Sequence, residues 1–306
     1  MLSKTSLFFS TYGKGLALLL ALLLGALVPQ AHNLAFLIQY SLMVMLFFAF
    51  LDIQFDPKSF QISVLWILFA NVAIAFIGYG IFASHSITLA LAAFMTGIAP
   101  SAIASLVVIN FIEGNVEYMI AAVLLTNLSS AVIVPLALPS LVGSVVPISI
   151  WDVLQSTLFV MFVPLILARL ARHLPANVLG VIRNGKHFSL PIWLVNLFLI
   201  SAKSVNFIRN ENASSLQLLL EIALISLGIC VIDFMIGAWI GAWIGGHQYR
   251  KEASQALGQK NLSFVVWIAL TFINPLVAMG PMFYILYHHL YNSWLIYRFE
   301  KQRIRF

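Results

Sequence analysis

The chain has 306 residues, of which 62% are hydrophobic and 8% are charged, and its formal net charge is +6. A soluble domain carries about 25% charged residues, so this composition excludes a water-soluble globular protein and predicts an integral membrane protein. The basic residues lie mostly in short loops, which is the orientation signal of a membrane protein rather than a nucleic-acid-binding patch. Apolar runs of about 20 residues or more predict membrane helices and not the shorter strands of a membrane barrel.

The first half of the chain is predicted to contain five membrane helices. Lys4 and Lys14 precede the first apolar run, which we interpret as a retained helix; a signal peptide is the alternative, although the segment lacks a small-x-small cleavage pattern. Pro100 interrupts the fourth run, because proline removes a backbone donor and clashes with the preceding turn. The expected helix ranges are 15–28, 34–50, 62–82, 87–100 and 118–138.

The second half is predicted to contain five further helices. The eighth helix of the chain carries Asp233 near its middle, and its glycines at four-residue spacing predict close packing against a neighbour. A basic loop is expected after the sixth helix, and Pro275, Gly280 and Pro281 are expected to interrupt the chain before the tenth. The expected ranges are 150–170, 190–207, 216–244, a ninth helix broken at 256–263, and a tenth helix that ends near residue 297.

The distribution of basic residues predicts the orientation in the membrane. Ten helices place both ends of the chain on one side, and that side then holds nearly all lysines and arginines of the loops and ends. The opposite side holds only Lys203 and Arg209, and Lys260 is expected within the membrane. Because basic loops stay in the cytoplasm, both termini are expected there, in a multi-pass plasma-membrane protein (the inner membrane in a bacterial host).

Two polar interruptions of apolar segments are the most informative feature. Residues 256–263 read Ala-Leu-Gly-Gln-Lys-Asn-Leu-Ser, and residues 97–105 read Gly-Ile-Ala-Pro-Ser-Ala-Ile-Ala-Ser. A charge at the bilayer centre costs roughly 3 kcal/mol on insertion scales, so a lysine in such a segment is functional or snorkels to the surface. Broken segments at matching positions of two halves are typical of transporters built from inverted repeats, and the halves here are residues 14–143 and 148–299.

These two breaks resemble the bile acid:sodium symporter superfamily. Residues 99–105, followed by Glu-Gly-Asn-Val at 113–116, are similar to that family's Pro-Gly-Gly-Thr-x-Ser-Asn segment and the turn after it. Residues 256–261 are similar to its Glu-x-Gly-x-Gln-Asn segment. The resemblance implies an all-α membrane protein with ten transmembrane helices in two inverted five-helix repeats, whose broken helices four and nine cross. It also implies a panel of helices one, two, six and seven beside a core of the other six.

The sequence departs from that family where its members bind two sodium ions. Ala256 stands at the glutamate position, Lys260 at the glutamine position and Leu106 at the asparagine position, and the helix-five hydroxyl positions fall on Met119 and Val123. Hard cations need several oxygen ligands, so we expect sodium-independent transport in which the Lys260 ammonium replaces the bound cation. A sodium-coupled organic anion symporter is the alternative, and proton coupling through the lysine stays open.

Each candidate residue also has a plainer interpretation. Lys260 could snorkel to the lipid headgroups. Asp233 is expected to pair with Lys260 or to carry a proton, or else to form a hydrogen bond with a neighbouring helix. Thr126 and Asn127 either line the crossing or simply link helices, and Asn71 stands near the position where the resemblance implies a sodium-binding glutamine. The candidate substrate- or ion-binding residues are Lys260, Gln259, Asn261, Gly258, Pro100, Ser101, Ser105, Thr126, Asn127, Asp233 and Asn71.

The sequence contains none of the motifs that would indicate an intramembrane enzyme or an ATP-driven pump. It lacks Gly-x-Ser-x-Gly and His-Glu-x-x-His, and no nucleotide-binding glycine pattern is found. Its one cysteine, Cys230, excludes a site with several thiolate ligands, so neither a metal nor a cofactor is expected. Positive half-helix ends together with Lys260 favour an anion. The sequence therefore predicts a secondary transporter of a small organic anion; a non-transporting receptor or scaffold is the alternative of another class.

Overall fold

The computed structural model describes residues 4–52, 60–143, 149–211 and 216–303, and in these ranges the chain forms thirteen α-helices and no strand. Five helical segments are long and apolar enough to cross a membrane. They are Ile62–Ala83, Val116–Val142, Ile150–Ala171, Ala176–Asn210 and Leu216–Trp243. The prediction of an all-helical, multi-pass membrane protein is therefore confirmed.

The helices of the first half follow the apolar runs of the sequence, and the predicted interruption at Pro100 is present. The fourth run is divided into two short helices by residues 99–103, which are not helical. The first helix begins earlier than the predicted residue 15, because the polar segment before the apolar run is helical as well. The elements are α1 (Lys4–Leu27), α2 (Leu37–Asp52), α3 (Ile62–Ala83), α4 (Ile87–Ile98), α5 (Ala104–Phe111) and α6 (Val116–Val142).

In the second half the ninth segment is broken where the sequence predicts it, and two other expectations are wrong. The basic loop after the sixth helix contains a helix, α8, all of whose residues are at least partly exposed. Pro275 does not interrupt the chain but begins α13, since proline is well tolerated at the first helical position, and Asn274 Oδ1 accepts the Val277 N–H there. The elements are α7 (Ile150–Ala171), α8 (Ala176–Asn184), α9 (Ser189–Glu211), α10 (Leu216–Trp243), α11 (Arg250–Gly258), α12 (Leu262–Phe272) and α13 (Pro275–Arg303).

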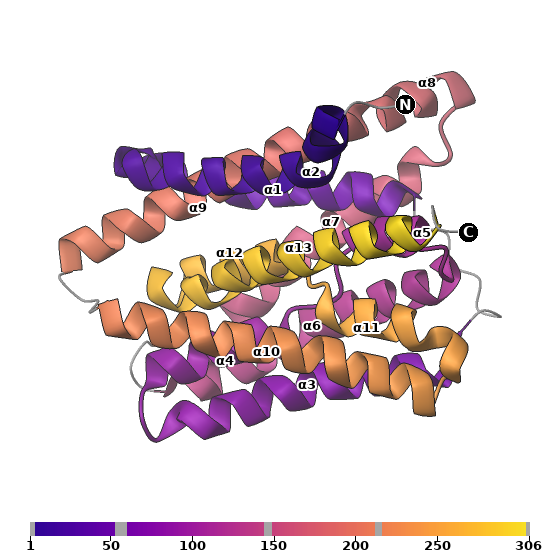
Figure 1. The fold of residues 1–306 in the computed structure, drawn as a ribbon. Coiled ribbons are helices and arrows are strands. Elements are labelled where there is room, and N and C mark those ends of the chain that lie inside the picture. Colours follow the sequence, from indigo (N-terminus) through magenta and orange to yellow (C-terminus); the bar gives the residue numbers. More distant parts are fainter. Residues whose placement is uncertain (1–3, 53–59, 144–148, 212–215, 304–306) are drawn as a thin grey trace.

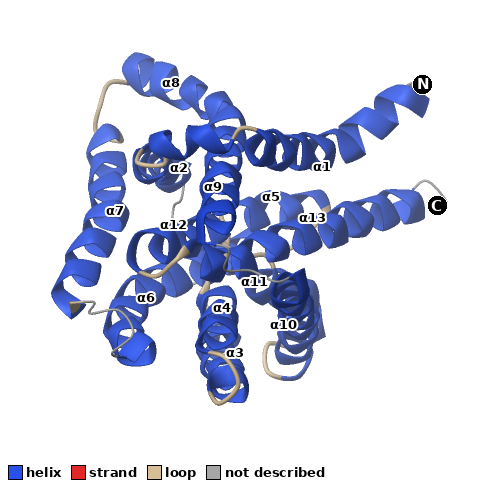
Figure 2. Cartoon of the chain, turned by 90° about the vertical axis from the view of Figure 1, so that its left-hand side faces the viewer, coloured by secondary structure: helices blue, strands red, loops and turns tan. Residues whose placement is uncertain are grey.

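The helices pack in two groups that lie against each other. Helix α9 contacts α1 and α2, and α2 also contacts α7. Helices α1, α2 and α9 lie along the upper side of the bundle in Figure 1, and α7 lies at the left-hand edge in Figure 2. Helix α3 packs on α4, and α10 packs on α11 and α13 on the other side. The groups meet through contacts of α6 with α7 and of α13 with α9. The first turns of α1 and the last turns of α13 lie toward the same end of the molecule (Figure 1).

The short broken helices form the centre of the protein. Residues 89–98 of α4 and 262–270 of α12 are buried without exception. These helices are apolar on every face, which is the pattern of a helix with no solvent or lipid side. The long helices α3 and α10 instead leave large apolar side chains such as Trp66, Phe69, Trp239 and Trp243 exposed. Non-helical backbone therefore lies inside protein, the only place at membrane depth besides a water-filled cavity where it is tolerated.

Candidate functional site

The two non-helical breaks meet and pair with each other. Ser101 and Lys260 form an antiparallel backbone bridge. The Ala102 N–H donates to the Gln259 carbonyl at 2.8 Å, and the Asn261 N–H donates to the Pro100 carbonyl at 2.6 Å. Each break therefore supplies hydrogen-bond partners to backbone groups of the other break that have no partner within a helix. Non-helical backbone at membrane depth requires such partners.

Small residues allow the breaks to approach their neighbours. A Cβ atom on Gly258 would overlap the ring of Phe234. A Cβ atom on Gly97 would lie 2.8 Å from the Cα atom of Ala75 on α3. Glycine is the only residue without a Cβ atom and therefore avoids both overlaps. Close packing thus explains why glycine occupies these two positions next to the breaks.

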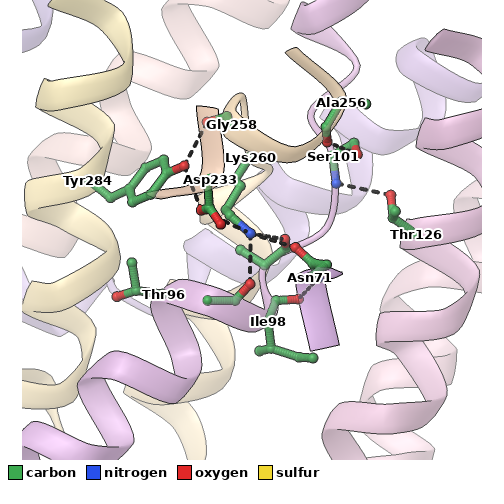
Figure 3. Close-up of polar contacts among 12 residues, drawn as sticks. Asn71, Thr96, Ile98, Ser101, Thr126, Asp233, Ala256, Gly258, Lys260 and Tyr284 are labelled. Carbon is green, nitrogen blue, oxygen red and sulfur yellow. Dashed lines mark hydrogen bonds and ion pairs between the residues drawn. The ribbon is translucent and has the colours of Figure 1, made fainter. Parts of the chain in front are cut away.

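The ammonium of Lys260 is enclosed by oxygen atoms (Figure 3). Its Nζ atom lies 2.7 Å from the Gly97 carbonyl, 3.3 Å from the Ala99 carbonyl and 2.5 Å from Asn71 Oδ1. An ion pair with Asp233 Oδ2 at 3.3 Å completes the shell, and both side chains are 0% exposed. The predicted pairing of the two charges is confirmed, and the interpretation of Lys260 as a snorkelling interfacial lysine is wrong.

The position of this ammonium also suits the electrostatics of α4. Gly97 and Ala99 lie at the carboxyl end of that helix, where carbonyl groups lack intrahelical partners. A cation at a helix C-terminus is stabilised by the partial negative charge of those carbonyls. The Lys260 ammonium therefore binds carbonyls at the carboxyl end of a helix from the other half of the chain.

Asp233 has a second partner that the sequence did not indicate. The hydroxyl of Tyr284, on α13, lies 2.9 Å from Asp233 Oδ2 and 2.7 Å from the Gly258 carbonyl. A phenol has a single proton and donates it to one of these oxygens at a time. Asp233 Oδ1 is buried with no hydrogen-bond partner among the described residues. The one signal in the sequence is a tyrosine in the interior of an apolar segment rather than at its end, where belt tyrosines lie.

Side chains of helix α6 form hydrogen bonds with the backbone of the first break. The Ser101 N–H donates to Thr126 Oγ1 at 3.0 Å, and Asn127 Nδ2 donates to the Ser101 carbonyl at 2.9 Å. Ser130 Oγ donates to the Ile98 carbonyl at 3.1 Å. Asn127 Oδ1 also accepts a long hydrogen bond of 3.4 Å from Asn261 Nδ2, so the polar patch of α6 contacts both breaks.

The remaining candidate residues lie close to the crossing but differ in their contacts. Asn71 Nδ2 donates to the Ile98 carbonyl at 3.2 Å while its oxygen faces Lys260. Ser101 Oγ donates to the Ala256 carbonyl. Ser105 Oγ donates within its own turn, to the Ala102 carbonyl. Gln259 Oε1 is buried and has no hydrogen-bond partner in the described part of the chain.

A second set of contacts joins the halves at the N-terminal end of α11. Glu252 Oε1 accepts the Asn115 N–H at 2.7 Å, and Lys251 Nζ donates to the carbonyls of Ile112 and Glu113 at 2.8 and 3.1 Å. Glu113 has a φ of 54°, which marks the tight turn that the sequence predicts between α5 and α6. Sequence reasoning missed the role of Glu252, because its partner lies 137 positions away in the chain.

A cavity of about 360 Å³ opens beside Asn127, between α2, α6 and α7. Its wall is formed mainly by aliphatic and aromatic side chains, including Phe162 and Leu165 of α7 and Leu124 of α6. Arg169 is the one basic residue of this lining among the described residues. Apolar walls with a few polar groups are typical of sites that bind small molecules. No group of three or more histidine, cysteine, aspartate or glutamate side chains that could hold a metal ion is found among the described residues.

A comparison with known protein families places these features in context. The sequence model of the sodium bile acid symporter family matches residues 29–211, which is more than half of the chain. The matched part contains the first break and the polar patch of α6, and it ends before α10, which carries Asp233, and before the second break, which contains Lys260. No curated protein matches the chain.

Proposed function

Because the chain belongs to the sodium bile acid symporter family, we propose that it is a secondary transporter of a small organic anion in which the Lys260 ammonium takes the place of a bound sodium ion. Transport is then independent of sodium. The observation that carries the proposal is the shell of Lys260, in which the amide oxygen of Asn71, two backbone carbonyls and a carboxylate all face one Nζ atom.

Such a shell is chemically what a hard cation requires. Sodium and similar ions bind several carbonyl, amide or carboxylate oxygens, and here the ammonium already occupies the position where these oxygens converge. At the position of the family's glutamate, the residue is Ala256, which has no side-chain oxygen. The proposal follows from these two facts together: one cation is built in, and a carboxylate for a second one is missing.

We further propose ten membrane spans in two inverted repeats, residues 14–143 and 148–299. In that arrangement α1, α2, α7 and α9 form the panel, and α3–α6 with α10–α13 form the core. The separate packing of these two groups supports the division. The shared end of both termini in Figure 1 and the basic residues near it support a cytoplasmic location of that end.

The substrate is proposed to bind in the cavity between the panel helices α2 and α7 and the core helix α6. Arg169 supplies a positive charge, Asn127 supplies polar contacts, and apolar side chains cover the rest of the wall. The N-terminus of α12, which begins next to Asn261, adds the positive end of a half-helix. Movement of the core against the panel around this site gives alternating access.

A coupled proton is the proposed substitute for the coupling ion, carried by the pair of Lys260 and Asp233. An ion pair that accepts or releases one proton changes its net charge, as the loading of a metal ion would. Uptake is therefore expected to depend on pH in the wild type and to lose that dependence in Asp233→Asn. An unchanged pH dependence in the variant excludes this role.

The experiment has two steps. A thermal-shift screen of the purified protein against organic acids, with and without sodium, first finds a ligand. Uptake of that ligand into proteoliposomes is then measured in sodium-free buffer for the wild type, Lys260→Ala, Lys260→Glu and the control Lys301→Ala, whose lysine is exposed on α13. We expect sodium-free uptake in the wild type and the control and its loss in both Lys260 variants. Strict dependence on sodium in the wild type refutes the built-in cation, and binding without uptake favours a receptor.

A further inference from the structure

A second and larger cavity lies on the outer face of the protein. It is a groove of about 1200 Å³ between α10, α11 and α13, which lie together on one flank in Figure 2. One wall follows α10 for most of its length. The exposed members of this wall are Leu227, Val231, Met235, Trp239 and Trp243, and each is at least 41% exposed.

The dimensions of this groove suit a long apolar chain better than a compact solute. From Leu227 to Trp243 the wall extends roughly 24 Å at about 1.5 Å per residue. One leaflet of the hydrocarbon core is roughly 15 Å thick, so the groove is long enough for an acyl chain and the region of its headgroup. Pockets for small molecules measure about 300–1,000 Å³ and enclose most of their ligand. This groove is larger and remains open along the lipid-facing side of α10.

One end of the groove is polar and positively charged. His247, Gln248, Arg250 and Lys251 line it where α10 gives way to α11. The hydroxyl-bearing rings of Tyr287 and Tyr291 lie on the same lining, on the α13 side. No carboxylate-bearing residue lines the groove in the described part of the chain. The Arg250 side chain is exposed at this end, whereas the Lys251 ammonium already donates to the Ile112 and Glu113 carbonyls and adds positive charge nearby. An apolar channel with a positively charged end matches an amphiphile with a negatively charged headgroup.

We propose that this groove binds an anionic phospholipid, with the phosphate at Arg250 and an acyl chain along the exposed face of α10. Basic pockets between membrane helices are recognised sites for anionic headgroups. The lipid lies in the leaflet that faces the basic end of the bundle. A small soluble anion has no acyl chain to bury against the long apolar wall. A zwitterionic lipid, whose headgroup carries no net charge, is attracted less strongly by the positive charge at the end of the groove.

The bound lipid would bridge two elements that position the crossing. Helix α10 carries Asp233, and α11 leads directly to Lys260. The two helices already pack without space for side chains at Gly237 and Gly241, and Ser254 Oγ donates to the Phe234 carbonyl at 2.9 Å. A lipid in contact with both helices adds to this packing from outside, so the stability of the crossing is expected to depend on lipid composition.

Native mass spectrometry of the purified full-length protein tests the proposal, with phosphatidylglycerol and phosphatidylcholine of equal chain length as probes. We expect preferential retention of phosphatidylglycerol, and about fivefold weaker retention in Arg250→Gln, since one basic residue near the membrane surface contributes about 1 kcal/mol. Ala238→Trp fills the groove and is expected to abolish the preference. Lys301→Gln removes the same charge from α13 outside the groove and serves as the matched control.

Three results of the retention measurements would overturn the proposal. They are equal retention of the two lipids by the wild type, unchanged retention in Arg250→Gln or Ala238→Trp, and an equal loss in Lys301→Gln. A protein that forms a dimer which Ala238→Trp dissociates also overturns it, because a second copy of the chain then covers this face. Thermal unfolding of each variant shows whether a loss reflects misfolding; a destabilised Ala238→Trp leaves Arg250→Gln, whose side chain is exposed, as the deciding comparison.

Discussion

Substitution of Lys260 by glutamine should convert this protein into one that responds to sodium. The variant restores the residue type that the resemblance to the sodium bile acid symporter family implies at this position. It removes the ammonium but leaves Asn71 Oδ1, the Gly97 and Ala99 carbonyls and Asp233 Oδ2 around the vacated space. Those oxygens and the new amide can supply a cation with several ligands and one formal negative charge.

The size of the response follows from linkage between binding and folding. A ligand that binds only the folded state adds RT ln(1 + [L]/Kd), which is about 1.6 kcal/mol at about 150 mM sodium for a dissociation constant on the order of 10 mM. For a protein of this size that free energy raises Tm by about 3 °C. The wild type should show no such rise, because its own ammonium fills the site.

Differential scanning fluorimetry in detergent measures this difference, with sodium chloride compared against choline chloride at equal ionic strength. Lys301→Gln carries the same change of charge at an exposed site and should behave as the wild type. The reasoning is refuted if sodium stabilises the wild type as much as Lys260→Gln. It is refuted equally if Lys260→Gln folds, as judged by its unfolding transition, and gains nothing from sodium.

Three further predictions concern stability, each measured by the unfolding midpoint in detergent. Lys260→Met and Asp233→Asn should each cost about 3–5 kcal/mol, and the double variant should recover much of that loss, since breaking a buried ion pair costs more than replacing it; additive losses would contradict the pairing. Gly258→Ala should cost about 1–3 kcal/mol through overlap with the ring behind it, whereas Gly180→Ala, with nothing within 4 Å of the new methyl group, should not destabilise. Tyr284→Phe should cost about 1–3 kcal/mol, because Asp233 or the Gly258 carbonyl then loses its phenol donor; a neutral effect would contradict both hydrogen bonds.

Much of the helical framework could be predicted from hydrophobicity alone. The expected ranges 62–82 and 150–170 agree with α3 and α7 to within one residue at each end. Long apolar runs leave few alternatives, since every backbone group in lipid must be satisfied within a helix or a closed barrel. The helix at 176–184 was missed because its polar and basic residues are typical of a loop, while its helical form depends on local backbone bonding.

At the crossing of the two breaks, too, some features could be predicted from the sequence and others could not. Pro100, Gly258 and Asn261 are visible as interruptions of apolar segments, so the positions of both breaks could be predicted. Whether Lys260 reaches the lipid headgroups or an internal oxygen shell depends on its depth, and periodicity does not specify depth. The contact of Tyr284 with Asp233 joins positions 51 residues apart on different helices. Such pairs depend on how helices pack, which a single sequence does not encode locally.

The antiparallel bridge between the breaks has a consequence for how the protein is made. Ser101 leaves the ribosome 155 residues before Ala256, whose carbonyl accepts the Ser101 hydroxyl, and still earlier than its bridge partner Lys260, so the earlier segment enters the membrane while the later one is still untranslated. Until then the Pro100 carbonyl lacks the Asn261 donor, the Ala102 N–H lacks the Gln259 acceptor, and the carboxyl end of α4 has no ammonium. The nascent chain must keep that region in contact with water or with the insertion machinery. A ribosome stalled between the two segments would therefore leave an intermediate that quality-control proteases can recognise.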